Sequence, residues 1–211
     1  MKVIATNLGK TTTVQWRGRA IQTGIYKYPV SEPLLLEKED VAKDTVIDRK
    51  HHGGEFKACY LFSADYYPDW KVKYPHLEWD WGMFGENLTV SGLNEDHLFV
   101  GDIYTLGTAK IQITEPRQPC HKLGIRFGNQ GVLQEFIDYG HPGTYVRILE
   151  EGLVKTGDEM VLESSDPNPL SIRQYNELVN SRDNDLNLVR LAVNNESIRE
   201  KKRKALQQLL Q

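Results

Sequence analysis

The chain has 211 residues, a formal net charge of −3 at pH 7 and a hydrophobic fraction of 39%, enough for one buried core with or without a small appendage. The slightly acidic balance excludes the basic footprint of a nucleic-acid-binding protein. No apolar run approaches the roughly 20 residues of a membrane helix, and the N-terminus lacks the apolar segment of a signal peptide. Two cysteines are too few for a disulfide framework. We therefore expect a cytoplasmic protein with reduced thiols.

Residues 1–165 alternate between short β-rich runs and turn signals made of Gly, Pro, Asn or Asp, a pattern that favours a mainly β structure such as a barrel or sandwich. Aromatic and aliphatic side chains recur at helical spacing in Ser63–Tyr74 and Gly131–Tyr139, where we expect short helices. The predicted strands are Lys2–Thr6, Thr12–Trp16, Ala20–Thr23, Pro33–Glu37, Leu88–Val90, Asp102–Leu106, Lys110–Thr114, Thr144–Leu149 and Glu159–Glu163.

The composition changes at Ser164–Pro169, which has the character of a linker; beyond it the chain lacks Gly and Pro and its pattern is helical. Ser171-Ile-Arg-Gln174 and Ser197-Ile-Arg-Glu200 both fit the capping box, in which two side chains satisfy orphan amides at the start of a helix. We predict a β domain over residues 1–165 and a C-terminal subdomain of three helices over residues 166–211.

A proline-braced loop, Glu115-Pro-Arg-Gln-Pro-Cys120, follows an alternating apolar strand and carries one of the two cysteines. Its prolines fix φ and withhold two backbone donors, so the loop is expected to be stiff. Arg117, His121 and Lys122 lie close by in the sequence. Because a thiolate is both a nucleophile and a soft metal ligand, this combination predicts a functional site at Cys120. The alternative is a buried free cysteine that acts as a small hydrophobe.

A second cluster, Asp48–Lys57, combines two adjacent histidines, a glycine pair and several cations. Glycines let backbone amides approach a ligand closely, and the cations favour an anionic group. A zinc site is disfavoured because adjacent side chains of an extended segment point to opposite faces. The alternative is a glycine turn with exposed charges. The candidate residues are Lys50, His52, Gly53, Gly54 and Lys57.

Two further segments carry candidate residues. The carboxylate and carboxamide in Phe84–Leu93 can hydrogen-bond the edge of a heterocycle, although a tight turn into a strand explains the same residues. The basic side chains in Gln15–Val30 can line a phosphate site or lie on the surface. Cys59, in an apolar run, is predicted to be part of the core. The candidates are Glu86 and Asn87 in the first segment, and Arg17, Arg19 and Lys27 in the second.

Taken together, these segments resemble the MOSC domain, named for the C-terminal domain of molybdenum-cofactor sulfurase. The matching elements follow in order over about residues 12–163, and the C-terminal helical pattern is similar to the three-helix extension of one bacterial branch, the YiiM-type 6-N-hydroxylaminopurine resistance proteins. The residues that carry the resemblance are Thr23–Val30, His52–Gly54, Phe84–Asn87, Val100–Ile103, Glu115–Cys120 and Glu150–Asp158.

The resemblance implies a β-barrel that binds the molybdenum cofactor, with Cys120 as the protein ligand to the metal. The implied activity is that of an oxidoreductase that reduces N-hydroxylated compounds, such as hydroxylamino-purines, to amines. His52 and His121 are candidates for proton transfer. The implied cofactor-binding residues are Arg17, Arg19, Lys27, Lys50, His52, Gly53, Gly54, Lys57, Glu86, Asn87, Arg117 and Pro119.

The sequence contains no flavin, haem or iron–sulfur motif, so electrons are expected from a separate donor reductase, and no pyridoxal phosphate is expected. One alternative is a carrier or binding module for the molybdenum cofactor without turnover. A second is a cysteine-nucleophile enzyme that pairs Cys120 with a histidine from elsewhere in the fold. Binding to nucleic acid, suggested by Lys201–Lys204, is disfavoured by a pI of 6.1, and a solvent-exposed helix face explains that run. We expect no membrane partner; a homodimer is left open.

Overall fold

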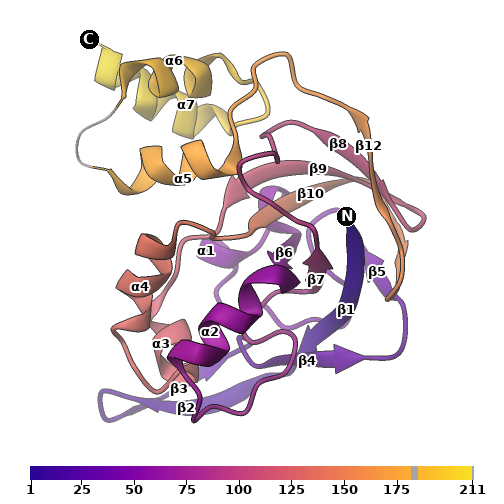
Figure 1. Ribbon diagram of the computed structural model, residues 1–211, viewed down its shortest axis with the longest axis vertical. Coiled ribbons are helices and arrows are strands. Elements are labelled where there is room, and N and C mark those ends of the chain that lie inside the picture. The colour runs from indigo at the N-terminus through magenta and orange to yellow at the C-terminus, as the bar shows by residue number, and fades with distance from the viewer. Residues whose placement is uncertain (182–184, 211) are drawn as a thin grey trace.

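One large sheet and two small ones form the β part of the computed structural model, which describes residues 1–181 and 185–210 (Figure 1). The strands of the large sheet are β1 (Lys2–Gly9), β4 (Lys27–Val30), β6 (Cys59–Ser63), β7 (Leu88–Ser91), β8 (Ile103–Leu106), β9 (Ala109–Pro116), β10 (Thr144–Glu150) and β12 (Met160–Ser164). They lie in the order β12-β8-β9-β10-β6-β7-β1-β4. All neighbours are antiparallel except β6 and β7, which are parallel.

Each small sheet is a pair of antiparallel strands: β2 (Thr12–Trp16) with β3 (Arg19–Thr23), and β5 (Leu34–Leu36) with β11 (Gly152–Val154). The helices are α1 (Arg49–His52), η1 (Glu55–Lys57), η2 (Ala64–Tyr66), α2 (Tyr67–Lys73), α3 (His121–Arg126), α4 (Val132–Tyr139), α5 (Ile172–Asn180), α6 (Leu186–Asn194), α7 (Glu200–Gln207) and η3 (Gln208–Leu210). Figure 1 shows α5, α6 and α7 gathered at one end beside β9, with α3 and α4 lower on the same side. None of the described helices has the length and apolar composition needed to cross a membrane.

The predicted barrel is corrected by the structure, because the eight-stranded sheet does not close. Within the described residues, its end strands β12 and β4 each pair with one neighbour in the large sheet. The sheet curls far enough for a bridge between Lys2 and Glu159 and three backbone hydrogen bonds to join residues 1–3 to residues 157–160. The rest of β1 and β12 are not paired with each other. Pro29 lies in β4 and has no backbone N–H to donate, which suits an edge strand rather than a closed ring.

The predicted strands all coincide with observed ones, and the two predicted helical segments contain η2, α2 and α4. β4, β6 and β11 are absent from the predicted strands, and α1 and α3 from the predicted helices. β6 is buried along its whole length, so it lacks the alternation that identifies a half-buried strand. β11 is only three residues long.

Strand β6 separates two apolar cores. Cys59 and Leu61 face a mainly aliphatic core that extends to the C-terminal helices, whereas Tyr60 and Phe62 face an aromatic core packed with α2, α3 and α4. This follows from the period of two in a strand, which sends successive side chains to opposite faces. Cys59 is therefore a core residue, as predicted. The aromatic core forms one wall of the candidate site.

The C-terminal helices confirm one predicted cap and correct the other. Ser171 and Gln174 form the capping box of α5, but α7 begins after Arg199 and no side chain caps it. The Ser197 hydroxyl is instead engaged by Gln112 and Asp166, so it cannot cap the helix. The predicted division at residue 165 stays a prediction; residues of the C-terminal helices share the aliphatic core with the sheet.

Candidate functional site

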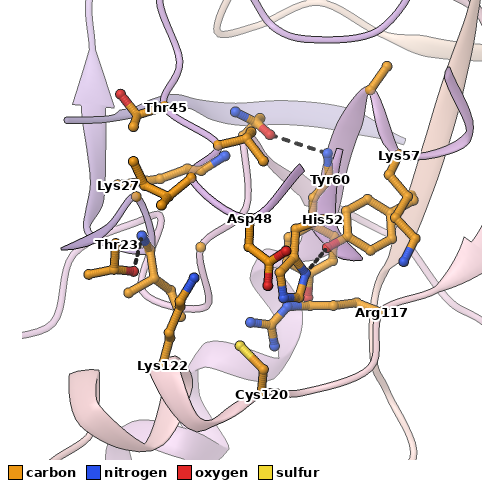
Figure 2. A pocket seen from close by; sticks show the side chains of 18 residues that line it. Thr23, Lys27, Thr45, Asp48, His52, Lys57, Tyr60, Arg117, Cys120 and Lys122 are labelled. Carbon is orange, nitrogen blue, oxygen red and sulfur yellow. Dashed lines mark hydrogen bonds between the residues drawn. The ribbon is translucent and has the colours of Figure 1, made fainter. Parts of the chain in front are cut away.

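An inner pocket of about 80 Å³ and an outer vestibule of about 320 Å³ share much of one wall. The outer space alone reaches the lower end of the size range of small-molecule sites. Figure 2 shows charged side chains from segments far apart in the sequence converging on the pocket. The residues that line both spaces are Asp48, His52, Lys57, Cys120, Lys122 and Tyr145.

The Cys120 thiol is half-buried and faces both spaces. Its backbone is extended at the point where the loop after β9 enters α3. Two contacts hold this loop: Gln118 Nε2 donates to Asn176 Oδ1 in α5 at 3.3 Å, and Gln130 Nε2 donates to the His121 carbonyl oxygen at 3.0 Å. These contacts support the prediction that the loop holding the Cys120 thiol is stiff. Within the described residues, no group of three His, Cys, Asp or Glu side chains is placed to hold a metal ion.

Arg117 is a buried cation with spare hydrogen-bonding capacity. Its side chain is 4% exposed, and the guanidinium carbon lies 5.3 Å from the Tyr60 ring centroid and 5.5 Å from that of Phe136. Its Nη1 has no hydrogen-bond partner among the described residues. Buried donors are almost always satisfied, so this unpartnered atom can donate to an acceptor that enters the pocket. Figure 2 places Arg117 beside Cys120 and His52.

His52 is held neutral in the pocket. Burial lowers its pKa to about 3, and the nearby charges of Arg117 and Lys57 act in the same direction. Its Nδ1 lies 3.3 Å from the Tyr145 hydroxyl oxygen, whose own pKa is raised to about 12 by burial. Both groups are therefore uncharged at neutral pH, and each can act as a hydrogen-bond donor or acceptor in the pocket.

Lys57 supplies a second cation to the pocket. Its Nζ donates to the His51 carbonyl oxygen at 2.6 Å and lies 3.4 Å from Glu115 Oε1. Burial lowers the Lys57 pKa, which Glu115 opposes. Lys122 adds a third cation at the rim and has no ion-pair partner in the part of the chain that the structure describes. The pocket thus has an excess of positive charge.

Lys27, Asp44 and Asn87 form a buried polar triad beside the pocket. Lys27 Nζ lies 2.6 Å from Asp44 Oδ2, and Asn87 Nδ2 donates to the same oxygen at 2.9 Å. Burial would raise the pKa of Asp44, but Lys27 and the hydrogen bonds outweigh it and lower that pKa. Lys27 and Asn87 line the pocket, and the Asn87 side-chain oxygen accepts from the Tyr60 amide at 3.3 Å.

Glu86 does not line either space. It is fully buried, and its carboxylate accepts from the Tyr67 and Thr89 hydroxyls and from two backbone amides of its own turn. These contacts account for Glu86 as the residue that fixes the turn before β7, and the predicted role in cofactor binding stays a prediction.

Several other predicted residues lie away from the pocket lining, and their roles stay predictions. Arg17 occupies the turn of the β2–β3 hairpin, with its guanidinium carbon 5.2 Å from the Trp16 ring centroid. Trp16 in turn stacks on His121 at 5.3 Å, and His121 and Pro119 line the outer vestibule. The predicted residues outside both linings are Arg17, Arg19, Lys50, Gly53, Gly54 and Glu86.

Sequence reasoning missed Tyr60 and Tyr145, which face each other across β6 and β10 and line the pocket. Aromatic residues in strands are more often core than site, so nothing in the sequence distinguished them. Lys122 and Asp48 belong to the two clusters singled out in the sequence, but they are not among the predicted site residues. The close sequence position of Lys122 to Cys120 was the available signal.

The model of the MOSC domain matches residues 48–161. The chain is 36% identical over 176 residues to the uncharacterized protein YflK of Bacillus subtilis, covering 83% of this chain and 79% of YflK. It is 31% identical over 175 residues to a Gibberella moniliformis protein named Reductase, covering 82% of this chain but only 31% of that protein. It is 30% identical over 144 residues to Protein YiiM of Escherichia coli, covering 67% and 64%.

The solved structures of YiiM have the same fold over nearly the whole chain. YiiM from Geobacillus stearothermophilus superposes with a TM-score of 0.82 at 28% identity, covering 100% of this chain and 99% of that one. YiiM from Escherichia coli gives 0.76 at 20% identity, covering 99% and 92%. The chain therefore belongs to the MOSC-domain family. Within that family it is of the YiiM type, since the match extends over the C-terminal helices as well as the sheet.

Proposed function

We propose that the pocket binds the molybdenum cofactor through the Cys120 thiolate, and that the protein reduces N-hydroxylated compounds to amines. The observation that carries the proposal is the pairing of a half-buried thiol with the unpartnered Nη1 of buried Arg117 in one pocket. A thiolate suits a soft metal, and the guanidinium suits a phosphate. The family match supports the same cofactor.

The described residues fit the charge and polarity of such a cofactor. Arg117, Lys57 and Lys122 would bind its phosphate. The Asn87 side-chain oxygen accepts from the Tyr60 amide, and its second lone pair would be offered to the pterin edge. The cofactor, when bound, supplies the redox chemistry that the side chains cannot. The chain supplies binding and orientation. These assignments extend the predictions for Arg117, Lys57 and Asn87, and add Lys122.

Reduction of an N-hydroxyl group to an amine consumes two electrons and two protons and releases water. His52 and His121 line the space where substrate would enter. His52 is neutral in the protein alone, but a bound anion next to it would raise its pKa. His52 would then hold a proton for the departing hydroxyl oxygen. The electrons come from a separate donor in this proposal.

The relative named Reductase supports an oxidoreductase activity, but this chain spans about a third of that protein, so the activity of the whole protein is not transferable. The protein should therefore be expressed in a host that makes the cofactor, as wild type, Cys120→Ala and Cys59→Ala. Cys59→Ala is the matched control, since it removes the thiol that faces the aliphatic core.

Molybdenum and pterin should be near-stoichiometric in wild type and Cys59→Ala and lost in Cys120→Ala. Reduction of a hydroxylamino-purine with a reduced viologen dye as artificial donor should follow the metal content. Bound cofactor without turnover would identify a carrier instead of an enzyme. A folded wild type that stays free of cofactor after reconstitution would reject the proposal and favour the cysteine-nucleophile alternative.

A further inference from the structure

Glu115 joins the pocket to the C-terminal helices. It lies in β9, two residues before Arg117, and its side chain is 5% exposed. Its Oε1 accepts from Arg199 Nη2 at 2.6 Å, and its Oε2 accepts from Lys202 Nζ. These two cations stand at the start of α7, 84 and 87 residues further along the chain. The same carboxylate faces Lys57, which lines the pocket.

The three cations compete for one carboxylate. Arg199 and Lys57 approach the same oxygen, but Arg199 lies at 2.6 Å and Lys57 at 3.4 Å. With Lys202 on the second oxygen, α7 occupies Glu115 with short contacts and leaves Lys57 the weakest one. This cluster of three cations and one carboxylate has a net charge of +2. Without the two cations from α7, Lys57 and Glu115 would neutralise each other.

We propose that Arg199 and Lys202 occupy Glu115 so that the Lys57 ammonium remains available to an anionic group in the pocket. Glu115 is thereby a positioning residue, and α7 sets the charge of a site that it does not line. The inference rests on the proposed function in one respect, namely that the ligand is anionic. The effect on Lys57 itself is independent of that function.

The electrostatic surroundings of Lys57 agree with this geometry. Burial lowers its pKa, Glu115 raises it, and Lys202 and Arg199 lower it. The other groups near Lys57 are the His51 carbonyl oxygen, the Tyr145 ring, whose centroid lies 5.3 Å from Nζ, and the neutral imidazole of His52, whose pKa the Lys57 charge helps to lower. Removal of the α7 cations should therefore raise the Lys57 pKa and draw its ammonium towards Glu115.

The test compares wild type with Arg199→Gln/Lys202→Gln. The matched control is Lys201→Gln/Lys204→Gln, which removes the same charge from the same helix at exposed positions. A third variant adds Glu115→Gln to the first pair. Lys57 is labelled by trace acetylation across a pH series and read by peptide mass spectrometry, and pterin retained per chain is measured on the same preparations. Thermal denaturation reports whether each variant folds.

In Arg199→Gln/Lys202→Gln the labelling midpoint of Lys57 should move up by about one pH unit, and pterin occupancy should fall about ten-fold. The control should match wild type. Adding Glu115→Gln should restore both values, because Lys57 then has no carboxylate to pair with. A purely structural role of the contact would not be rescued by a further substitution.

An unchanged midpoint in a folded Arg199→Gln/Lys202→Gln protein, or no rescue by Glu115→Gln, would overturn the inference. If the double variant does not fold, Lys202→Gln alone should give a smaller shift in the same direction, and no shift would count against the coupling. A shifted midpoint with no pterin in wild type would support the coupling and reject the proposed function. An unshifted midpoint with pterin bound would reject the coupling and support the proposed function.

Discussion

The Nδ1 atom of His52 lies 3.3 Å from the hydroxyl oxygen of Tyr145, although the two residues are 93 positions apart in the chain. Tyr145 comes from β10 and His52 ends α1, directly before the glycine pair. The contact fixes the imidazole over the pocket that Cys120 faces. The lowered pKa of His52 follows from this enclosure and from the cations around it.

This pKa gives the protein a pH dependence with a defined sign. The folded value is about 3 against 6.5 for an unperturbed histidine, so between these values the unfolded chain binds a proton that the native protein does not. The His52 contribution to stability is therefore present above pH 6.5 and is lost as pH falls towards 3, by up to about 1.4 kcal/mol per pH unit. Urea unfolding of wild type and His52→Gln as a function of pH measures it.

His52→Gln should flatten this dependence, whereas His97→Gln, at an exposed position, should leave it as in wild type. Equal slopes in His52→Gln and wild type would show that His52 is not the neutral group inferred here.

Arg117→Met should separate stability from binding. The substitution removes a buried cation with an unpartnered Nη1 but keeps an unbranched side chain near Tyr60 and Phe136. We expect the thermal midpoint of the cofactor-free protein to stay equal or rise, because the cost of burying an unpaired donor disappears. Pterin retention should fall at least about ten-fold, since a charge-assisted contact is lost. A strongly lowered midpoint with full retention would contradict both expectations.

Asp44→Asn should be among the most destabilising polar substitutions. It leaves Lys27, whose side chain is 8% exposed, without its counter-ion, and breaking a buried pair from one side costs about 3–5 kcal/mol. Adding Lys27→Met should recover part of that loss. A double-mutant cycle by urea denaturation measures the coupling, with Glu177→Gln, in the exposed pair with Arg173, as a control that should change little. Additive effects would mean that the pair is not coupled.

Ser171→Ala should cost about 1 kcal/mol, because it removes one half of the capping box at the start of α5. Ser171→Thr keeps the hydroxyl and should recover most of the loss. Denaturant midpoints of the two variants provide the measurement. Equal destabilisation by Ala and Thr would indicate a packing effect at this buried position instead of a lost cap.

Local signals were the most predictable part of this chain. Alternating strands, the Ser171 capping box and the proline-braced loop all depend on residues a few positions apart. They can therefore be predicted from short stretches of sequence. Whether a cation points into a pocket is a different kind of property. Arg117, Lys27 and Lys57 line the pocket, whereas Arg17 and Arg19 do not, and the spacing of charges did not separate the two groups.

Contacts between distant segments were the least predictable part. Glu86 looked like a ligand-binding carboxylate, but its own turn and the Tyr67 and Thr89 hydroxyls take up its oxygens. Ser197 had the spacing of a cap, yet its hydroxyl is held by residues of the sheet and linker. The link from Glu115 to α7 spans 84 residues. Which hydrogen-bond partner each of these side chains finds depends on tertiary packing, and the spacing of residues along the sequence does not show that packing.

Successive side chains of β6 point to opposite faces of the sheet, and this has a practical consequence for thiol chemistry. Cys59 is 1% exposed on the aliphatic face, with its pKa raised to about 12 by burial, whereas Cys120 is half-exposed in the pocket. An alkylating reagent should therefore modify one thiol in the native protein and two after denaturation. The second thiol thus serves as a built-in reporter of the folded state, and native alkylation marks the pocket at a single known atom.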